Sequence, residues 1–394
     1  MHRAAPRAAR RSHLAPEEGS RMPGDGAHAE HERHMRRALE LAALGRGLVS
    51  PNPMVGAVVV RDGHMAGEGW HEGPGTPHAE VRALAAAGDR SRGATLYCSL
   101  EPCDHVGRTP PCTNAIVEAG IAQVVVATGD PNPVVDGRGF ERLRAAGVEV
   151  EVGDLGPDAQ RLNAAFERHV VTGLPLVTLK TAASLDGRTA ARDRTSQWIT
   201  GEDARMDAHV LRGAADAIVA GAGTVIADDP SLTVRDPSYH GHPPLRVVVD
   251  SSGRVPPDSR VFDGSAPTLI ATTERVDRVR ADAWAANGAE VVSFDRDATG
   301  GVSLPELMAH LGKRDVQDVL LEGGATLAWS FVRDRLVDRV VLYLAPKLIG
   351  GSEAPGILMG DGFAPITEAA TLRIVAVERL GGDLRVEADV HRDR

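Results

Sequence analysis

The sequence predicts a two-domain α/β protein in which each domain is a layered assembly of strands and helices. The chain has 394 residues, enough for about two domains of ordinary size. In both halves, short apolar runs of strand length alternate with segments of helical periodicity, a pattern typical of α/β folds. A stretch of helical periodicity at residues 158–171 separates the two halves. We therefore expect a first domain at residues 30–173 and a second at residues 174–394.

The composition is that of an ordinary globular protein with enough apolar residues for a core in each domain. The hydrophobic fraction is 42% and the charged fraction 25%. Aromatic residues make up only 3%, so the core must consist mainly of Ala, Val and Leu. The net charge of −10 argues against nucleic acid as a partner, because nucleic-acid binders usually carry a basic face. No apolar run approaches the roughly 18 residues of a membrane span, so we expect no membrane partner.

The cysteines and the amino-terminal segment bear on where the protein works. Three cysteines allow no even-numbered disulfide framework, so we expect a reducing cytoplasm. Residues 1–29 are rich in arginine and alanine and lack the apolar core of a secretory signal. An organelle transit peptide is an alternative that Glu17 and Glu18 weaken. We expect a disordered tail, or a true start at Met22 or Met35.

Periodicity and turn residues predict the elements of the first half. Apolar residues at three- and four-residue spacing predict a helix from about residue 30, which Gly45 and Gly47 end. Pro77 suits the start of a helix, so His78 and Glu80 should lie in a first helical turn. The other expected elements are strands at 55–60, 64–70, 95–100 and 123–128, a short helix from 116, and a helix and strand within 139–152.

Four residues between positions 78 and 112 carry the clearest chemical signal in the chain. They are His78, Glu80, Cys103 and Cys112, and each cysteine follows a proline. One imidazole and two thiolates make three zinc ligands and leave a fourth tetrahedral position open for water. Glu80 is not needed as a ligand and is free to move protons between water and substrate. The order matches the signature of zinc-dependent base deaminases, except that eight residues instead of two separate the cysteines.

These residues have two alternative roles besides catalysis. A structural zinc normally has four protein ligands, and His71 or His105 could supply the missing one. A pair of buried thiols is a further alternative. An adjacent glutamate that is not a ligand favours catalysis. Cys98 alternates with Leu96 and Leu100 on one face of a strand, so we interpret it as a core residue.

Three segments of the first half, at residues 51–53, 67–80 and 101–112, carry a specific combined pattern, and the last ends in Gly-Arg-Thr-Pro-Pro-Cys. Together they resemble the bifunctional riboflavin-biosynthesis deaminase–reductases, whose usual insert between the cysteines has this length. Asp104, Val106 and Arg82 depart from the residues common in that family, and none is a metal ligand. The resemblance implies a cytidine-deaminase-like α/β/α domain of three layers. It also implies one zinc ion on His78, Cys103 and Cys112, Glu80 as the catalytic residue, and Asn52 and His71 in the substrate pocket.

The second half has three strand ends that could hold a ligand. The strand at 176–179 ends at Lys180, one of only three lysines in a chain with 44 basic residues. Two interpretations stand. Either the compact ammonium group of a lysine is needed there, or the lysine lies at a solvated edge and arose by evolutionary drift. The strand at 217–220 runs into Gly221-Ala222-Gly223, a weak nucleotide signal without the third Rossmann glycine.

The strand at 318–321 gives a stronger signal because it runs into Glu322-Gly323-Gly324 and then a helix. Backbone N–H groups at such a helix start can cradle phosphates. Taken alone, a plain strand-to-helix turn is the commoner explanation, but two glycine-bearing strand ends in one domain favour a dinucleotide across them. The other expected elements are a helix at 202–212 and strands at 247–250, 336–345 and 372–390.

The resemblance extends over the second half and implies a domain similar in fold to dihydrofolate reductase that uses NADPH. The matching positions imply NADPH contacts at Ala182, Trp198, Thr224, Asp228 and Ser251, with the phosphates held by a loop of Gly324, Ala325, Thr326, Leu327, Ala328, Trp329 and Ser330. The implied substrate contacts are Ser196, Thr200, Arg212, Leu232, Arg235 and Glu322, to which we add Lys180. Guanidinium forks at Arg212 and Arg235 would suit a sugar phosphate.

The sequence therefore predicts a two-step enzyme of riboflavin synthesis that acts on a small molecule. The resemblance implies deamination of 2,5-diamino-6-ribosylamino-4(3H)-pyrimidinone 5′-phosphate, followed by NADPH-dependent reduction of the ribosyl group to give 5-amino-6-ribitylamino-uracil 5′-phosphate. We also expect a homo-oligomer. The alternatives are a nucleoside- or transfer-RNA-type zinc deaminase with an unrelated second module, and a non-catalytic regulator that binds zinc and NADPH.

Overall fold

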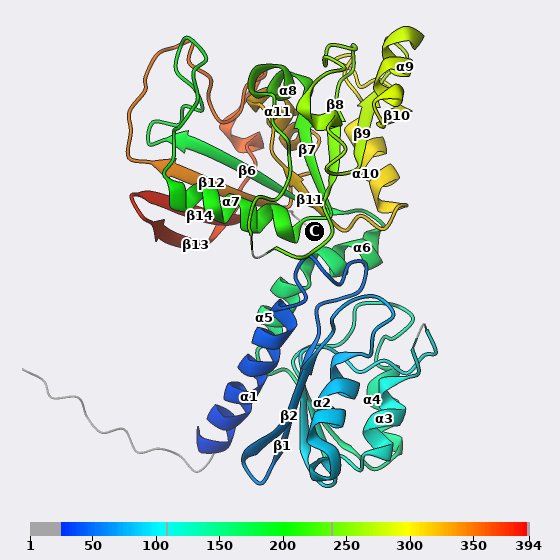
Figure 1. The fold of residues 1–394 in the computed structure, drawn as a ribbon. Coiled ribbons are helices and arrows are strands. Elements are labelled where there is room, and N and C mark those ends of the chain that lie inside the picture. The colour runs from blue at the N-terminus through cyan, green and yellow to red at the C-terminus, as the bar shows by residue number, and fades with distance from the viewer. Residues whose placement is uncertain (1–24, 108, 238, 392–394) are drawn as a thin grey trace, which may run out of the picture.

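The computed structural model describes residues 25–107, 109–237 and 239–391, which form two sheets drawn from separate halves of the chain (Figure 1). Among these residues, the first sheet has five strands in the order β2-β1-β3-β4-β5. The second has nine, in the order β10-β9-β8-β7-β11-β6-β12-β14-β13. Helices accompany both sheets, so the prediction of two α/β domains is confirmed.

The first sheet is mixed, and helices cover both of its faces. Strand β1 pairs antiparallel with β2 and β3, whereas β3, β4 and β5 run parallel. Its strands are β1 (Gly56–Arg61), β2 (His64–Trp70), β3 (Thr95–Cys98), β4 (Gln123–Val126) and β5 (Glu149–Val152). The helices of this half are α1 (Asp25–Ala43), α2 (Ala79–Ala87), η1 (Gly88–Ser91), α3 (Cys112–Glu118), α4 (Arg138–Ala145), α5 (Gly156–Leu162) and α6 (Ala164–Thr172).

Two apolar clusters hold these layers together. Val58 of β1 points to one face and packs with Met35 of α1, whereas its neighbour Val59 points to the other face and packs with Ala83 of α2. This alternation follows from the two-residue period of a strand. Cys98 is fully buried in the second cluster, so its interpretation as a core residue is confirmed. The expected three layers are therefore present.

The second sheet is parallel from β10 through β12 and ends in an antiparallel hairpin. Its strands are β6 (Leu176–Ser184), β7 (Ala217–Gly221), β8 (Leu245–Val249), β9 (Thr268–Thr272), β10 (Glu290–Ser293), β11 (Asp318–Leu321), β12 (Arg339–Ala345), β13 (Leu372–Leu380) and β14 (Asp383–Val390). The helices are α7 (Glu202–Ala214), α8 (Ala222–Asp228), η2 (Arg260–Phe262), α9 (Arg278–Ala286), α10 (Leu304–Gly312), α11 (Ala325–Arg333) and η3 (Ile366–Glu368). Parallel strands bring their carboxyl ends to one edge of the sheet, where the loops after β8, β7, β11 and β6 are neighbours.

Several elements differ from their predicted bounds. Helix α1 begins at Asp25, so residues 25–29 belong to it, and the rest of the expected disordered tail lies outside the described residues. Strand β6 continues past Lys180 to Ser184 because parallel pairing with β12 extends that far. Residues 372–390 form the hairpin of β13 and β14 instead of one strand. None of the helices in the described ranges is long and apolar enough to cross a membrane.

Candidate active sites

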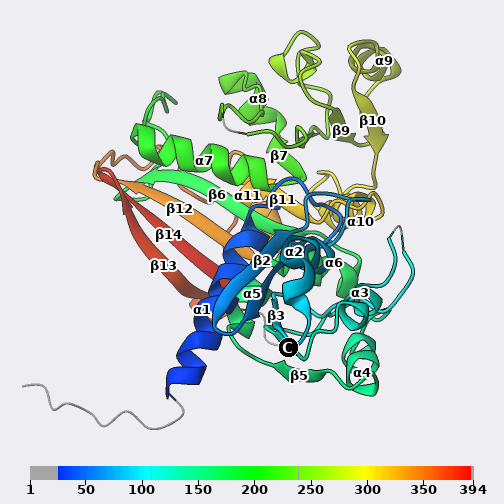
Figure 2. The same cartoon turned by 60° about the horizontal axis from the view of Figure 1, so that its bottom comes forward.

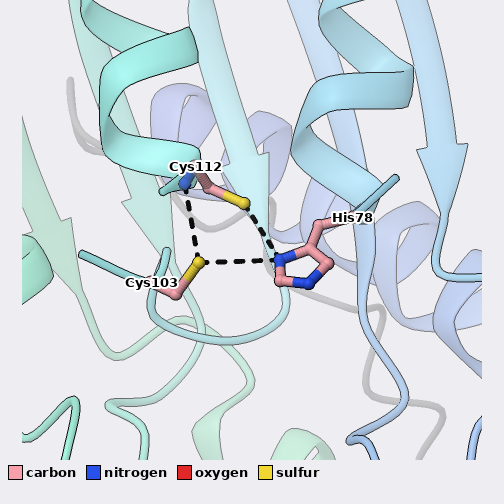
Figure 3. A group of neighbouring side chains, drawn as sticks. All are labelled: His78, Cys103 and Cys112. Carbon is pink, nitrogen blue, oxygen red and sulfur yellow. Dashed lines mark hydrogen bonds between the residues drawn. The ribbon is translucent and has the colours of Figure 1, made fainter. Parts of the chain in front are cut away.

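His78, Cys103 and Cys112 converge at the amino-terminal ends of two helices (Figure 3). His78 caps α2, Cys112 opens α3, and Cys103 lies in the loop after β3. Their potential ligand atoms all lie within 4.8 Å of one another. Nδ1 of His78 lies 3.2 Å from Sγ of Cys112 and 3.6 Å from Sγ of Cys103. One imidazole nitrogen and two sulfurs at this spacing fit a zinc ion.

The two cysteine side chains differ in how readily they lose a proton. The hydrogen bond that Cys103 Sγ accepts from the Cys112 thiol lowers the pKa of Cys103. The same bond raises the pKa of Cys112, which donates it. The backbone N–H of Cys112 also points at Cys103 Sγ, at 3.5 Å. Because the thiolate is the form that binds metal, the lowered pKa of Cys103 favours its role as a ligand.

Glu80 lies in the first turn of α2, as predicted, whereas His78 is the cap just before that turn. The side chain of Glu80 is buried, and it is within hydrogen-bonding reach of Cys112. Burial, followed by the negative charge of Cys103, raises the pKa of Glu80 to about 7. A carboxyl group that titrates near neutrality can both accept and donate a proton. This arrangement suits an acid–base catalyst beside a metal ion.

No fourth protein ligand joins the cluster within the described part of the chain. His105, one of the two candidates, is exposed and outside the cluster. His71, the other, is buried with its ring edge-on to that of His78 at a centroid distance of 5.3 Å. Nε2 of His71 lies 2.9 Å from Nδ2 of Asn52. The sequence-predicted pocket residues Asn52 and His71 are therefore together beside the cluster, and three protein ligands would leave a tetrahedral zinc one position for water.

Thr109 lies within the Gly-Arg-Thr-Pro-Pro-Cys motif and is a functional candidate that was not among the predicted site residues. Its Oγ1 lies 3.1 Å from Nε2 of His78, on the side of the ring that faces away from the sulfurs. A partner on the second ring nitrogen fixes the tautomer and orientation of a metal-binding histidine. Only its place inside Gly-Arg-Thr-Pro-Pro-Cys could have indicated Thr109 from the sequence, because its contact depends on the orientation of the His78 ring.

A loop after β4 also reaches this region and was not predicted. The buried carboxylate of Glu101 accepts backbone N–H groups of Asp130, Gly137 and Gly139 at 3.3, 3.2 and 3.0 Å. Burial raises the pKa of Asp130 to about 6, and Cys103 and His105 are among the groups that act on it. Glu101 thus anchors residues 130–139 beside the metal cluster. No local sequence pattern links these distant positions.

In the second domain, most predicted cofactor residues lie near the carboxyl edge of the sheet. Ser251 follows β8, Thr224 lies on α8 after β7, Gly324 follows β11, and Ala182 is near the end of β6. The N–H of Gly324 donates to Oγ1 of Thr224 at 2.8 Å, so the two glycine-bearing strand ends are in direct contact. Asp228 is the last residue of α8. Four adjacent strand ends therefore supply these positions.

The predicted phosphate loop from Gly324 through Ser330 is mostly helix. Gly324 is the cap of α11, and residues 325–330 lie within that helix. Ala328 and Trp329 are buried, and Trp329 packs edge-on against Phe363 at a centroid distance of 5.0 Å. Only the first turn of an α-helix has free backbone N–H groups, and the N–H of Gly324 is already donated to Thr224. Residues 325–327 can therefore offer donors to a phosphate, whereas the prediction of residues 325–330 as a loop is wrong.

Three charged residues predicted to bind substrate meet at the end of β11. Glu322 receives a two-pronged ion pair from Arg212, with Nε–Oε1 at 2.8 Å and Nη2–Oε2 at 2.6 Å. Nζ of Lys180 lies 3.8 Å from Oε2 of Glu322. Burial alone would raise the pKa of Glu322, but Lys180 and Arg212 lower it to about 2. Lys180 is half-buried and faces this carboxylate, so the interpretation that it arose by evolutionary drift at a solvated edge is wrong.

Arg212 and Arg235 differ in what they can offer to a phosphate. The fork of Arg212 is occupied by Glu322, and its Nη1 donates to the Thr233 carbonyl at 3.1 Å. The expected open fork at Arg212 is therefore absent. Arg235 is exposed, and its backbone N–H donates to Nδ1 of His209 at 3.2 Å. Burial and the nearby Arg212 lower the pKa of His209 to about 4. Sequence reasoning missed His209, which has no motif.

The remaining predicted contacts lie on loops around this edge. Ser196, Trp198 and Thr200 belong to the loop between β6 and α7. The Arg205 guanidinium lies 4.7 Å from the centroid of the exposed Trp198 ring, and Lys347 Nζ donates to the Trp198 carbonyl at 2.7 Å. Leu232 is buried with a φ of +49°. Among the described residues, Asp228 and Ser251 form no hydrogen bond with another predicted cofactor residue, so their roles stay predictions.

Family models match both halves of the chain. The model described as the cytidine and deoxycytidylate deaminase zinc-binding region matches residues 28–128, and the RibD C-terminal domain matches residues 175–386. The riboflavin biosynthesis protein RibD of Bacillus amyloliquefaciens is 42% identical over 373 residues, which cover 92% of this chain and 100% of that protein. The RibD of Escherichia coli (strain K12) is 41% identical over 366 residues, which cover 90% and 98%.

Solved structures agree with these matches. Acinetobacter baumannii RibD aligns with a TM-score of 0.82 at 37% identity, covering 93% of this chain and 100% of that chain. A diaminohydroxyphosphoribosylaminopyrimidine deaminase/5-amino-6-(5-phosphoribosylamino)uracil reductase from Thermotoga maritima aligns with a TM-score of 0.81 at 36% identity, with the same coverage of 93% and 100%. The alternative of an unrelated second module is therefore wrong. The chain belongs to the RibD family of riboflavin-biosynthesis enzymes, with a zinc-dependent deaminase domain followed by an NADPH-dependent reductase domain.

Proposed function

We propose that the chain first deaminates 2,5-diamino-6-ribosylamino-4(3H)-pyrimidinone 5′-phosphate and then reduces the ribosyl group of the product to a ribityl chain. The name of the Thermotoga maritima relative describes this pair of activities for that protein. The observation that most supports the proposal here is the buried Glu80 beside the cluster of His78, Cys103 and Cys112. Such a site has both an open metal position and a proton carrier.

In the deaminase site, each residue has a separate task. His78, Cys103 and Cys112 would hold a zinc ion, and this ion would supply a Lewis acid that lowers the pKa of water toward neutrality. Glu80 accepts a proton from the attacking water and delivers one to the leaving amino nitrogen, so that ammonia departs. Its pKa of about 7 makes both transfers accessible. Asn52 and His71 bind the pyrimidine beside it, and Thr109 holds the His78 ring in place.

In the reductase site, the chain mainly positions its two ligands. NADPH, when bound, would supply the hydride for reduction at C1′ of the ribosyl group. Residues 325–327 at the start of α11 offer backbone donors to its phosphates, beside Thr224. The further proposed NADPH contacts are Ala182, Trp198, Asp228 and Ser251, and the proposed substrate contacts are Ser196, Thr200 and Leu232. Arg235 holds the sugar phosphate, while Glu322, ordered by Lys180 and Arg212, accepts hydrogen bonds from the sugar.

Three further proposals concern organisation. The boundary between the domains lies near residues 173–174, in the turn between α6 and β6. The protein is a homo-oligomer, which the exposed apolar side chains Ile374 and Val377 on the edge strand β13 support. It works in a reducing cytoplasm, in keeping with three cysteines that are all free thiols.

The test is a two-stage assay on the purified protein. With the diaminopyrimidine phosphate and no NADPH, we expect release of ammonia in an amount equal to the substrate consumed. Addition of NADPH should then give oxidation of NADPH in the same amount. Absence of ammonia release from zinc-loaded protein would overturn the proposal, and binding of NADPH without turnover would favour a regulator.

A further inference from the structure

The loop between α1 and β1 belongs to the deaminase domain but contacts the reductase domain (Figures 1 and 2). It carries Asn52, the partner of His71 in the deaminase pocket. Gln317, the residue before β11 in the reductase domain, donates its Nε2–H to the carbonyl of Pro51 at 2.7 Å. The side chain of Gln317 in the reductase domain is therefore hydrogen-bonded to Pro51, the residue immediately before Asn52 of the deaminase pocket.

Gln317 is itself held firmly. Its backbone N–H donates to Oδ2 of Asp216 at 2.7 Å, and its carbonyl accepts the N–H of Leu176 at 2.7 Å. Only 5% of its surface is exposed. The two hydrogen bonds of its backbone N–H and carbonyl fix the backbone from which the side-chain amide extends. A buried amide N–H without an acceptor would lower stability, so the amide needs the Pro51 carbonyl. The bond to Pro51 thus fixes the loop relative to the reductase sheet.

Two neighbouring contacts tie the same loop to the reductase domain. The hydroxyl of Ser50 hydrogen-bonds to Asp216, the carboxylate that also holds Gln317. Gly47 lies directly against Gly213 near the end of α7, and a Cβ atom on Gly47 would come within 2.0 Å of the Gly213 carbonyl oxygen. Gly47 also has a φ of +71°, which favours glycine. The backbone approach is therefore too close for a side chain.

On its other side, the loop is clamped by the segment that joins the domains. Asn163, between α5 and α6, accepts the N–H of Met54 at 2.8 Å and donates to the Met54 carbonyl at 2.9 Å. Asn52 is therefore bracketed by Gln317 on one side and Asn163 on the other. The chain of contacts then continues from Asn52 to the ring of His71, which lies edge-on to His78.

We propose that Gln317 is a positioning residue for deamination, although it lies in the reductase domain. By holding the Pro51 carbonyl, it places Asn52 and thereby orients His71 beside the metal cluster. This inference rests on the proposed role of Asn52 and His71 in the deaminase pocket. Gln317 and Glu322 flank opposite ends of β11, roughly 16 Å apart at about 3.3 Å per residue. Loss of the Gln317 amide should therefore spare reduction.

The experiment compares full-length, zinc-loaded wild type with Gln317→Met, Asn52→Ala and the double variant. Methionine has a similar length but no donor and adds no buried charge. We expect Gln317→Met to lower kcat/KM for ammonia release about tenfold, the effect of losing one well-placed contact. In the Asn52→Ala background the same substitution should change it less than about twofold, because Gln317 acts through Asn52. NADPH oxidation with supplied deaminated intermediate should be unchanged.

A spectroscopic readout separates positioning from general destabilisation. With ¹⁵N-labelled histidine, the His71 ring nitrogen resonances of Gln317→Met should move in the direction seen for Asn52→Ala. Gln317→His, which keeps an N–H donor, should restore part of the lost deamination. Gln160→Met, the same change at an exposed position of α5, should leave both activities and the His71 signals as in wild type.

Each other outcome is decisive. Wild type that releases no ammonia would overturn the proposed function itself. An active wild type with an equally active Gln317→Met and unmoved His71 signals would overturn only the positioning role. Independent, multiplicative effects of Gln317→Met and Asn52→Ala would also overturn it, as would loss of zinc or of both activities, since these would mark Gln317 as merely structural.

Discussion

The deaminase site takes its metal ligands from residues 78–112, whereas the polar cluster of the reductase site joins Lys180, Arg212 and Glu322 from three elements. In the first site, two helix starts and one loop bring an imidazole and two thiols within 4.8 Å. In the second, ion pairs join one carboxylate to two cationic side chains, and the proposed cofactor contacts lie along several strand ends.

This difference teaches where the chemistry of each domain resides. The deaminase domain concentrates its chemistry in one metal position and one carboxyl group, so a single change should abolish the reaction. The reductase domain leaves the chemistry to its cofactor and uses many residues for orientation. Single substitutions in the reductase domain should therefore lower its activity less, and they should also lower the stability of the domain. The following predictions test this contrast, from the largest effect to the smallest.

Removal of zinc should separate the two sites most completely. Dialysis against a chelator is expected to lower ammonia release by about 10³-fold or more, because no protein group can replace the Lewis acid. Reduction of supplied deaminated intermediate should stay within about twofold of the untreated enzyme. Zinc content, ammonia and NADPH oxidation are measured on one preparation, and added zinc should restore deamination. Parallel loss of both activities would show that the metal supports the whole structure.

Glu322→Gln should have the largest effect in the reductase domain. The substitution leaves Arg212 and Lys180 without their buried counter-charge, which costs about 3 kcal/mol in the free energy of unfolding of that domain. We expect kcat/KM for reduction to fall about 100-fold, equivalent to about 2.7 kcal/mol, with deamination unaffected. Glu368→Gln, at an exposed position in the same domain, is the matched control. Unchanged reduction and stability in Glu322→Gln would refute the role of this cluster.

Thr109→Val should weaken the metal site without destroying it. The hydroxyl that contacts Nε2 of His78 is lost while the volume is kept. Loss of such an outer partner typically lowers metal affinity or activity about 10- to 100-fold. Zinc titration with a competing chelator and ammonia release measure the effect, and Thr109→Ser should stay near wild type. A Val variant with wild-type zinc affinity and rate would mean that the His78 ring is fixed by other contacts.

The pH dependence of stability should report the Glu322 ion pairs. Their effect is to lower the pKa of Glu322 from 4.5 to about 2 on folding. A carboxylate with a depressed folded pKa stabilises the protein above the unfolded value, and this stabilisation is lost as pH falls toward the folded value. The difference in unfolding free energy between wild type and Glu322→Gln should therefore be constant from about pH 7 to 5 and shrink below about pH 4.5.

Urea unfolding of the two proteins at matched pH values gives this difference. Other acidic groups titrate in both proteins and cancel in the comparison. A difference that grows on acidification would contradict the charge pairing of Glu322.

The metal site could be predicted from the sequence because its residue types are rare and their order is local. His78 and Glu80 are two positions apart at a helix start, and the two cysteines flank one loop. The ion pair between Arg212 and Glu322 could not be predicted, since 110 residues separate its members and only the sheet order brings them together. The contact from Gln317 to Pro51 spans 266 residues and two domains.

The fold shows a similar limit. The strands predicted at 55–60 and 64–70 are β1 and β2, and Asp62-Gly63 between them is a strong turn signal that fits their antiparallel pairing. No elements were predicted between residues 268 and 312, where the structure has β9, α9, β10 and α10. Strand β10 is exposed at both ends, and β9 is a run of five buried residues with a threonine at each end. Such short segments lack a periodicity that distinguishes strand from helix.

The most direct test of two independent active sites is Glu80→Gln, assayed for zinc, ammonia and NADPH oxidation in one preparation. The substitution keeps the size of the side chain but removes its ability to carry protons, so we expect full zinc content and a loss of deamination of about 10³-fold or more. Reduction of supplied deaminated intermediate should stay at the wild-type rate. Retained deamination would contradict the role of Glu80, and loss of both activities would contradict the independence of the two sites.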